Sequence, residues 1–222
     1  MVTPWAALYH IAKERTAQRA QQLLGNQYAG VATCDRLKSY WWIPRLQWCW
    51  AHLRRDFQAM IDRGNQGKAI GKSLLGQSNT LFHLWHQFGE GQLSRTRLQA
   101  AMQPVRAAVR STLQQGQACQ CRKTAGTCKE LLAHEAWLWT FVDVAGVEPT
   151  NNEAERIERQ AVLLRKTSGG TDSAHGSRFV ERVLTVVHTC RRQGKKVLDY
   201  LRACIESWRH NLAPPSLVAD TS

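Results

Sequence analysis

Apolar residues recur at spacings of three and four along most of the chain, and this pattern predicts a mainly helical protein. In the clearest case, Trp50, Leu53, Phe57 and Ile61 share one face of a helix. Further helical patterns cover residues 73–88, 94–115 and 128–142, while the polar, Gly-containing stretch 114–126 is predicted to be a loop. The middle of the chain is therefore expected to be all-helical.

The same spacing continues after Pro149, which interrupts the pattern. A new helix is predicted from Asn151-Asn152 to about Lys166, and Gly169-Gly170 mark a loop. A long helix follows and ends at Gly194, and its core-facing positions are Phe179, Val180, Val183, Leu184, Val187 and Cys190. A last helix carries Val197, Leu198, Leu201, Ile205 and Trp208, and the Pro/Ser-rich tail over 213–222 is expected to be frayed.

The first part of the chain has a different pattern. Residues 6–11 form a short apolar run typical of a strand, residues 14–24 have helical spacing and stop at Gly25, and residues 30–34 form a second short strand that ends at Asp35. The order strand, helix, strand is typical of an α/β layer. The fold class predicted for the whole chain is therefore α/β with a helical region.

Charge adds a partner to this picture. The 222 residues include 30 Lys and Arg against 17 Asp and Glu, which gives a formal net charge of +13 and a pI near 9.9. Such a surplus predicts a polyanionic partner, with nucleic acid the first candidate and an anionic membrane surface the second. No apolar run approaches the ~20 residues that span a bilayer, so the chain is not expected to cross a membrane.

The N-terminus and the thiols bear on the compartment. The chain begins without a basic segment ahead of an apolar run, so it is not predicted to carry a secretory signal. The seven cysteines are irregularly spaced, which favours free thiols over a disulfide framework. We therefore expect a cytoplasmic protein.

Three acidic residues are candidates for chemistry. Asp35 follows a short strand, where ligands and metals are often held, but an Asp there also commonly starts a turn. Glu153 and Glu155 lie in the first turn of a predicted helix, where acids also act as capping-box residues favoured by the helix dipole. The two glutamates point in different directions, so at most one joins Asp35 easily, and helical spacing alone does not choose between them.

Cations surround these acids. Six lie within 27 residues, a density that favours phosphate contact over isolated surface charge: Arg156, Arg159, Arg165, Lys166, Arg178 and Arg182. A second cluster at a helix junction either serves nucleic acid too or satisfies a helix C-terminus: Arg191, Arg192, Lys195 and Lys196.

Cys49 and His52 have half of a zinc-site spacing, but no standard second half follows. A Cys–His pair for nucleophilic catalysis lacks an evident third group that would orient it. A structural contact at the start of the helical region is the preferred interpretation. The aromatic residues over 40–50 are interpreted as core rather than as a base-stacking platform.

Long segments of the chain resemble one family. Pro149-Thr-Asn-Asn-Glu-Ala-Glu-Arg156, Arg165-Lys-Thr-Ser168, Gly176 to Val187 and Gln193 to Leu201 look like the C-terminal half of an insertion-sequence 66 family transposase. Cys34-Asp35 with Tyr40, and the segment Cys49 to Phe57, match the middle of that family. The similarity runs from about Val2 to Trp208.

The resemblance implies an RNase H-like core, incomplete because its first strand is missing, and interrupted by an all-helical insertion. The implied divisions are 1–48 for the N-terminal part of the core, 49–145 for the insertion, 146–212 for the C-terminal helical part and 213–222 for the tail. It also implies a DDE-type enzyme that cleaves and joins DNA at transposon ends in the bacterial cytoplasm. Its partners would be transposon-end and target DNA, and itself or a full-length transposase.

The resemblance also assigns residues. Asp35 matches the second acid of the catalytic triad and Glu155 the third, and both would hold Mg²⁺ or Mn²⁺. Cys49 and His52 match a structural C-x-x-H signature of the insertion. The cations expected to contact DNA are Arg156, Arg165, Lys166, Arg178 and Arg182.

One departure from the family concerns activity. The family's first Asp lies upstream of the segment that aligns with residues 1–4, and Glu14 is the only acid before Asp35. The chain is therefore expected to be a truncated transposase without cleavage activity and with an exposed sheet edge. Two alternatives remain open: a non-catalytic DNA-binding protein that modulates an intact transposase, and a zinc-binding interaction module built on Cys49 and His52.

Overall fold

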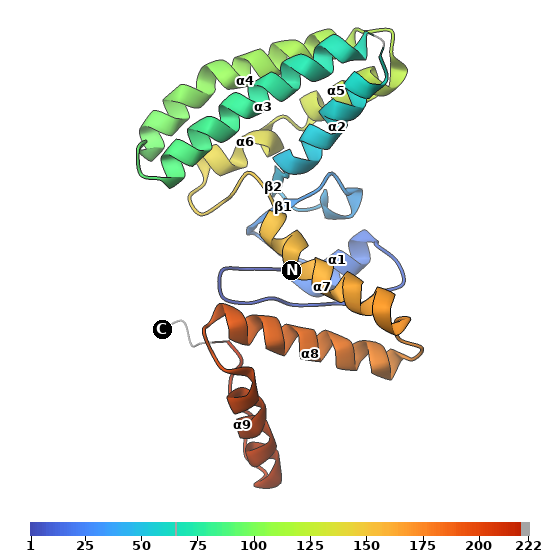
Figure 1. Ribbon diagram of the computed structural model, residues 1–222, viewed down its shortest axis with the longest axis vertical. Coiled ribbons are helices and arrows are strands. Elements are labelled where there is room, and N and C mark those ends of the chain that lie inside the picture. The colour runs from blue at the N-terminus through green and yellow to red at the C-terminus, as the bar shows by residue number, and fades with distance from the viewer. Residues whose placement is uncertain (65, 219–222) are drawn as a thin grey trace. The chain divides into compact units, whose positions relative to one another are not determined.

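The computed structural model describes residues 1–64 and 66–218, and its contacts divide the chain into two compact units. The first unit combines residues 1–19 with the segment from Asn152 onward, and the second is Ala20–Asn151. Figure 1 shows their elements. We call them the discontinuous unit and the continuous unit.

The continuous unit begins with α1 (Ala17–Leu24), whose first residues belong to the other unit, and with a two-stranded parallel sheet. Strand β1 (Val31–Cys34) confirms the predicted second strand. It pairs in register with β2 (Arg45–Trp48), from Val31 opposite Arg45 to Cys34 opposite Trp48. Strand β2 was not predicted, because its polar–apolar alternation covers only four residues and continues directly into the helical pattern.

Helices make up the rest of this unit: α2 (Trp50–Asp62), α3 (Gly67–Gly89), α4 (Arg95–Gln117), α5 (Arg122–Ala133) and α6 (Ala136–Asp143). The long helices α3 and α4 run side by side (Figure 1). Ser94 caps α4 by accepting a hydrogen bond from the Arg97 N–H at 3.3 Å. A Cβ at Gly71 would lie 2.5 Å from the Phe57 carbonyl oxygen, so glycine allows the close approach of α2 and α3.

Two predictions in this region were wrong. The single helix expected over 128–142 is divided between α5 and α6 by a turn at His134–Glu135. The expected loop over 114–126 is mostly helical and shrinks to residues 118–121. Polarity predicted a loop there, but Leu113, Gly116 and Cys128 are buried and hold the ends of α4 and α5 together.

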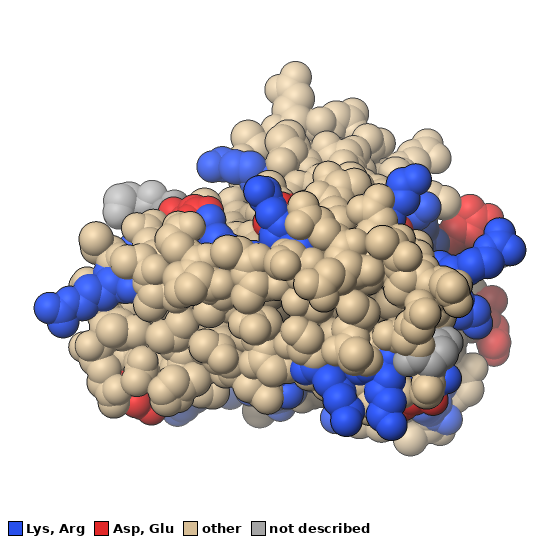
Figure 2. Space-filling model, turned by 90° about the horizontal axis from the view of Figure 1, so that it is seen from above, with Lys and Arg blue, Asp and Glu red and all other residues tan. Residues whose placement is uncertain are grey.

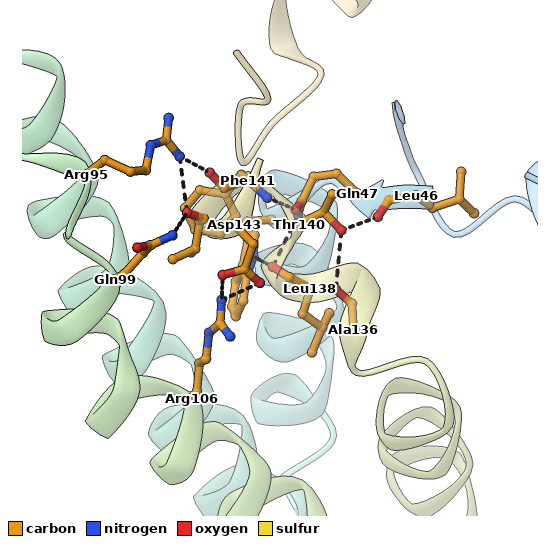
Figure 3. Close-up of polar contacts among 12 residues, drawn as sticks. Leu46, Gln47, Arg95, Gln99, Arg106, Ala136, Leu138, Thr140, Phe141 and Asp143 are labelled. Atoms are coloured by element: carbon orange, nitrogen blue, oxygen red, sulfur yellow. Dashed lines mark hydrogen bonds and ion pairs between the residues drawn. The ribbon is translucent and has the colours of Figure 1, made fainter. Parts of the chain in front are cut away.

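The core of the continuous unit contains a fully buried polar side chain, Gln47 of β2. Its amide donates to the carbonyl oxygens of Trp48 at 2.7 Å and Leu138 at 3.3 Å, and its Oε1 accepts from the Phe141 N–H at 2.8 Å. Figure 3 shows the bonds of Gln47 to Leu138 and Phe141, together with the bond from the Thr140 hydroxyl to the Leu46 carbonyl at 2.5 Å. Because every polar atom of the amide has a partner, burial of Gln47 ties β2 to α6 instead of destabilising the core.

The discontinuous unit contains α7 (Asn152–Ser168), α8 (Ala174–Arg192) and α9 (Val197–Arg209), as the C-terminal pattern predicted. The strand predicted over 6–11 was wrong, since the only pairing there is an isolated bridge between Val2 and Ala7. The segment instead lies along α8. The N–H groups of Ala7, Tyr9 and Ile11 donate to Thr189, Thr185 and Glu181 side chains at 3.1, 3.1 and 2.5 Å.

The periods of the two elements explain this pairing. Two residues of extended chain rise by about 6.6 Å and four residues of helix by about 6 Å, so every second amide meets one side chain per helical turn. Side chains along α8 thus accept the hydrogen bonds that the carbonyl groups of a neighbouring strand would otherwise accept. We call residues 7–11 the strap.

The structure is mostly helical with a small parallel sheet, in agreement with the α/β class. The RNase H-like topology and the predicted boundaries at 48, 145 and 212 stay predictions. Residues 219–222 of the predicted tail lie outside the described residues, and within 213–218 the Pro215 carbonyl accepts a hydrogen bond from the Tyr200 hydroxyl at 3.2 Å.

Candidate metal-binding acids and nucleic-acid interface

Asp35 directly follows β1, at the carboxyl end of the parallel pair. It is partly buried, and its Oδ1 accepts a hydrogen bond from the Leu37 N–H at 3.3 Å, so it does start a turn. Burial, followed by the charges of Asp35 and Cys49, raises the pKa of the Cys34 thiol to about 12. The carboxylate is therefore the anionic ligand that this strand end offers, and the thiol beside it stays protonated.

Arg36 holds the turn after Asp35 in place. Its guanidinium forms ion pairs with Asp56 of α2 at 2.9 Å and with Glu130 of α5 at 2.6 Å. Burial raises the pKa of Asp56, while the ion pair with Arg36 acts in the opposite direction. The position of Asp35 is thus set by the helices as well as by its strand.

Glu153 and Glu155 lie in the first turn of α7 and differ in their surroundings. Glu153 is exposed, and its carboxylate accepts a hydrogen bond from Arg192 of α8 at 2.7 Å, which lowers the pKa of Glu153. Glu155 is partly buried. Glu153 therefore serves the packing of α7 on α8, and this favours Glu155 as the candidate ligand.

Asp35 belongs to the continuous unit and Glu155 to the discontinuous unit. Their convergence on a shared metal ion remains a prediction. The donor chemistry fits the expected ion, because carboxylate oxygens are the ligands that Mg²⁺ and Mn²⁺ prefer.

Cys49 is buried at the N-cap position of α2, where strand, helix and returning chain meet. Its N–H donates to the Cys34 carbonyl at 2.8 Å, and its Sγ accepts from the Asn151 N–H at 3.5 Å. His52 follows in the first turn, with a ring nitrogen within 4.8 Å of that sulfur. These contacts support the structural interpretation of Cys49 and His52, which stays a prediction.

The cations predicted to contact DNA share one property: all are exposed, and none forms a side-chain hydrogen bond or an ion pair within residues 1–64 and 66–218. They are Arg156, Arg159, Arg165, Lys166, Arg178 and Arg182. The second cluster is mixed, because Arg192 is mostly buried and paired with Glu153 whereas Arg191, Lys195 and Lys196 are exposed.

A basic hollow in the continuous unit escaped the sequence analysis. Arg36, Arg63, Arg122 and Lys123 line it, with Glu130 as its acid, at the N-terminal end of α5. The adjacent basic pair Arg122-Lys123 was the sequence signal that could have indicated this hollow. The other two cations that line it, Arg36 and Arg63, come from distant segments of the chain. Figure 2 shows another aspect of the charge: on the face seen there, Lys and Arg side chains lie around a broad uncharged area.

Comparison with known proteins places these features in a class. The family model described as Transposase IS66 family matches residues 3–178, a span that includes Asp35, Glu155 and five of the six exposed cations. The chain belongs to the IS66 family of transposases. No solved structure matches it.

One curated relative is the uncharacterized protein y4qI of Sinorhizobium fredii (strain NBRC 101917 / NGR234). It is 28% identical over 164 residues, which are 71% of this chain and 30% of that protein. The chain thus spans less than a third of the length of this relative. In the described part of the chain, no helix has the length and apolar character needed to cross a membrane.

Proposed function

We propose that this chain acts in DNA transposition, as part of an enzyme that cleaves and transfers DNA strands with divalent metal ions. The family match over residues 3–178 carries this proposal. Asp35 and Glu155 would hold Mg²⁺ or Mn²⁺ within an RNase H-like core, and 49–145 would be its helical insertion. In two-metal sites the ions activate the attacking oxygen and stabilise the leaving oxygen.

The exposed cations would bind DNA. Arg156, Arg165 and Lys166 lie on α7, and Arg178 and Arg182 lie on α8, all in one unit. With no competing carboxylate partner in the described residues, each can neutralise a phosphate without first breaking an ion pair. The basic hollow around Arg122 and Lys123 would add a second phosphate contact.

The third carboxylate is the open point of this proposal. Within residues 1–222 the only acid before Asp35 is Glu14, which is exposed and outside any strand. The purified 222-residue chain is therefore expected to bind DNA without cleaving it. The exposed cations of α7 and α8 do not depend on these acids, and they support a second candidate function, a DNA-binding protein that modulates an intact transposase.

DNA binding is tested with a fluorescent duplex over a series of salt concentrations. The triple variant Arg156→Gln/Arg165→Gln/Lys166→Gln should reduce the slope of log K against log salt by about 2 to 3, since each phosphate contact contributes about 0.9. Arg106→Gln is the matched control, because Arg106 is held by Asp143 at 2.8 Å. Equal losses in both variants would contradict the proposed interface.

The metal site is tested by Mn²⁺ binding, followed by electron paramagnetic resonance. Asp35→Asn and Glu155→Gln should each weaken binding, and the double variant should add little if both acids hold the same ion. Glu153→Gln is the control and should bind Mn²⁺ normally. Plasmid nicking by the wild-type chain that disappears in Asp35→Ala would overturn the prediction of inactivity while supporting the acid assignment.

A further inference from the structure

Helix α9 leaves a continuous apolar stripe uncovered. Leu198, Leu201, Ile205 and Trp208 are 79, 42, 56 and 78% exposed. Large apolar side chains at such exposures, adjacent on one helix, mark an interaction surface.

The spacing of the stripe is that of a helix-pairing seam. Its residues follow one another at intervals of three, four and three, the a/d pattern of a heptad repeat. Asn211 then adopts a left-handed conformation with φ 54°, and the Leu212 N–H bonds to the Ser207 carbonyl at 2.8 Å. Because this turn ends the helix, Leu212 lies after α9 and is not part of the stripe.

The described C-terminal residues cover a different side of α9. The Tyr200 hydroxyl donates to the Pro215 carbonyl at 3.2 Å, and Gln193 at the end of α8 donates to the Leu217 carbonyl at 3.0 Å. At 100° per residue, Tyr200 lies about 120° around the helix from the centre of the stripe. Figure 1 shows α9 leading away from the end of α8 within the same unit. Neither α8 nor residues 213–218 therefore shield the stripe.

Charge indicates what covers it. The chain carries a net +13, yet α9 is neutral, with Asp199 and Glu206 balancing Arg202 and Arg209. A neutral apolar face does not suit a DNA backbone. Because α9 has no net charge, two strongly basic chains can approach each other through this helix with less electrostatic repulsion than through their basic surfaces.

Charge also selects an orientation. Arg202 and Arg209 occupy the e positions beside the seam, and Val197 and Cys204 occupy the g positions that face them. In a parallel pair each e residue faces a g residue of the other helix, so the arginines meet neutral side chains. An antiparallel pair would place arginine opposite arginine.

The exposed area fits a weak dimer. If each exposed fraction is scaled by the roughly 150–250 Å² of a large side chain, the four residues of the stripe offer roughly 400–600 Å² per copy. Stable interfaces bury about 800 Å² per partner, and transient ones less than about 600 Å². The seam therefore falls in the transient range.

We propose that α9 pairs in parallel with α9 of a second copy of this chain and forms a dimer in the micromolar range. This interface lies beyond residues 3–178, the part matched by the family model. It does not rest on the metal site or on the DNA contacts.

The test is sedimentation equilibrium of the full chain from about 1 to 200 μM, with circular dichroism as a check of folding. The wild-type chain should reach the mass of two copies. Leu198→Glu/Trp208→Glu should remain monomeric and folded, with a dissociation constant raised at least about 100-fold. Phe179→Glu is the matched control, because Phe179 is 62% exposed on α8, and it should dimerise normally.

Three results would overturn the proposal: a wild-type chain that is monomeric at 200 μM, equal loss of dimer in the Phe179→Glu control, or unfolding of the seam variant. The last would show that the chain itself covers the stripe. Mild oxidation tests orientation, because Leu198→Cys links two copies only if the helices are parallel, against the background of native Cys204. Linkage by Ile205→Cys but not by Leu198→Cys would overturn the parallel arrangement.

Discussion

The two units differ in how they dispose of apolar surface. The continuous unit buries its large side chains, including Trp48, Trp50, Phe57 and Phe141. Within the described residues, the discontinuous unit buries only Ala7, His188, Thr189 and Cys190, and every large apolar side chain that is highly exposed belongs to it. One unit is stabilised by its own core, whereas the other presents surface that suits a partner.

The largest expected effect on stability is that of replacing a buried tryptophan, Trp50, in comparison with an exposed one, Trp208. Trp50→Ala should cost about 3–5 kcal/mol, because it opens a cavity and leaves the Leu138 carbonyl without the indole N–H at 2.8 Å. Trp208→Ala should change the stability of the monomer by less than about 0.5 kcal/mol. Urea unfolding at low micromolar protein measures both. Similar costs at the two positions would break the contrast between the units.

A smaller effect is expected where the strap meets α8. Thr189→Val removes the hydroxyl that both accepts from the Ala7 N–H and donates to its carbonyl, each at 3.1 Å. The loss should be about 1–2 kcal/mol and local to the discontinuous unit. Hydrogen exchange should accelerate at residues 7–11 and not in α2–α6. Thr167→Val, whose hydroxyl bonds only within its own helix, is the control and should leave the strap unchanged.

The smallest effect is a pH dependence at His188. Burial, followed by the charges of Arg191 and Arg192, lowers the pKa of His188 below 6.5, and its ring lies 5.4 Å from that of Tyr9. Below pH 6.5 His188 is therefore protonated in the unfolded chain but still neutral in the folded unit. The free energy of unfolding falls as the pH drops toward the pKa of His188 in the folded state.

The protection factors of the strap amides, which correct for the pH dependence of intrinsic exchange, should accordingly fall on acidification. His188→Phe keeps an aromatic ring and retains the His10–Glu181 contact, so it should remove this part of the pH response. An identical pH profile in the variant and the wild-type chain would assign the response to another group.

The helices were largely predictable because their signal is local. Ser94, the apolar spacing of α2 and the glycines near 170 and 194 each act over a few residues. The strap and β2 were not predictable in this way. A short apolar run favours extended chain, but whether it pairs with a strand or with Thr185 and Thr189 of a distant helix depends on residues more than 170 positions away.

The residues of the candidate site were also predictable only in part from the sequence. Periodicity and capping left Glu153 and Glu155 equivalent, and the resemblance to a family selected Glu155 together with Asp35. The structure adds a physical distinction, since Arg192 engages Glu153. The basic hollow was missed because Arg36, Arg63 and Arg122 are brought together by three separate elements.

The strap also imposes an order on synthesis. Ala7 and Thr189 are separated by 182 positions, so the strap leaves the ribosome long before its helix exists. At about 5–20 residues per second, the delay is on the order of 10 to 40 s. The continuous unit is encoded entirely within that interval and can complete its core first. During this time the amides of residues 7–11 have only water as a partner, so the strap reaches its final place long after it is made.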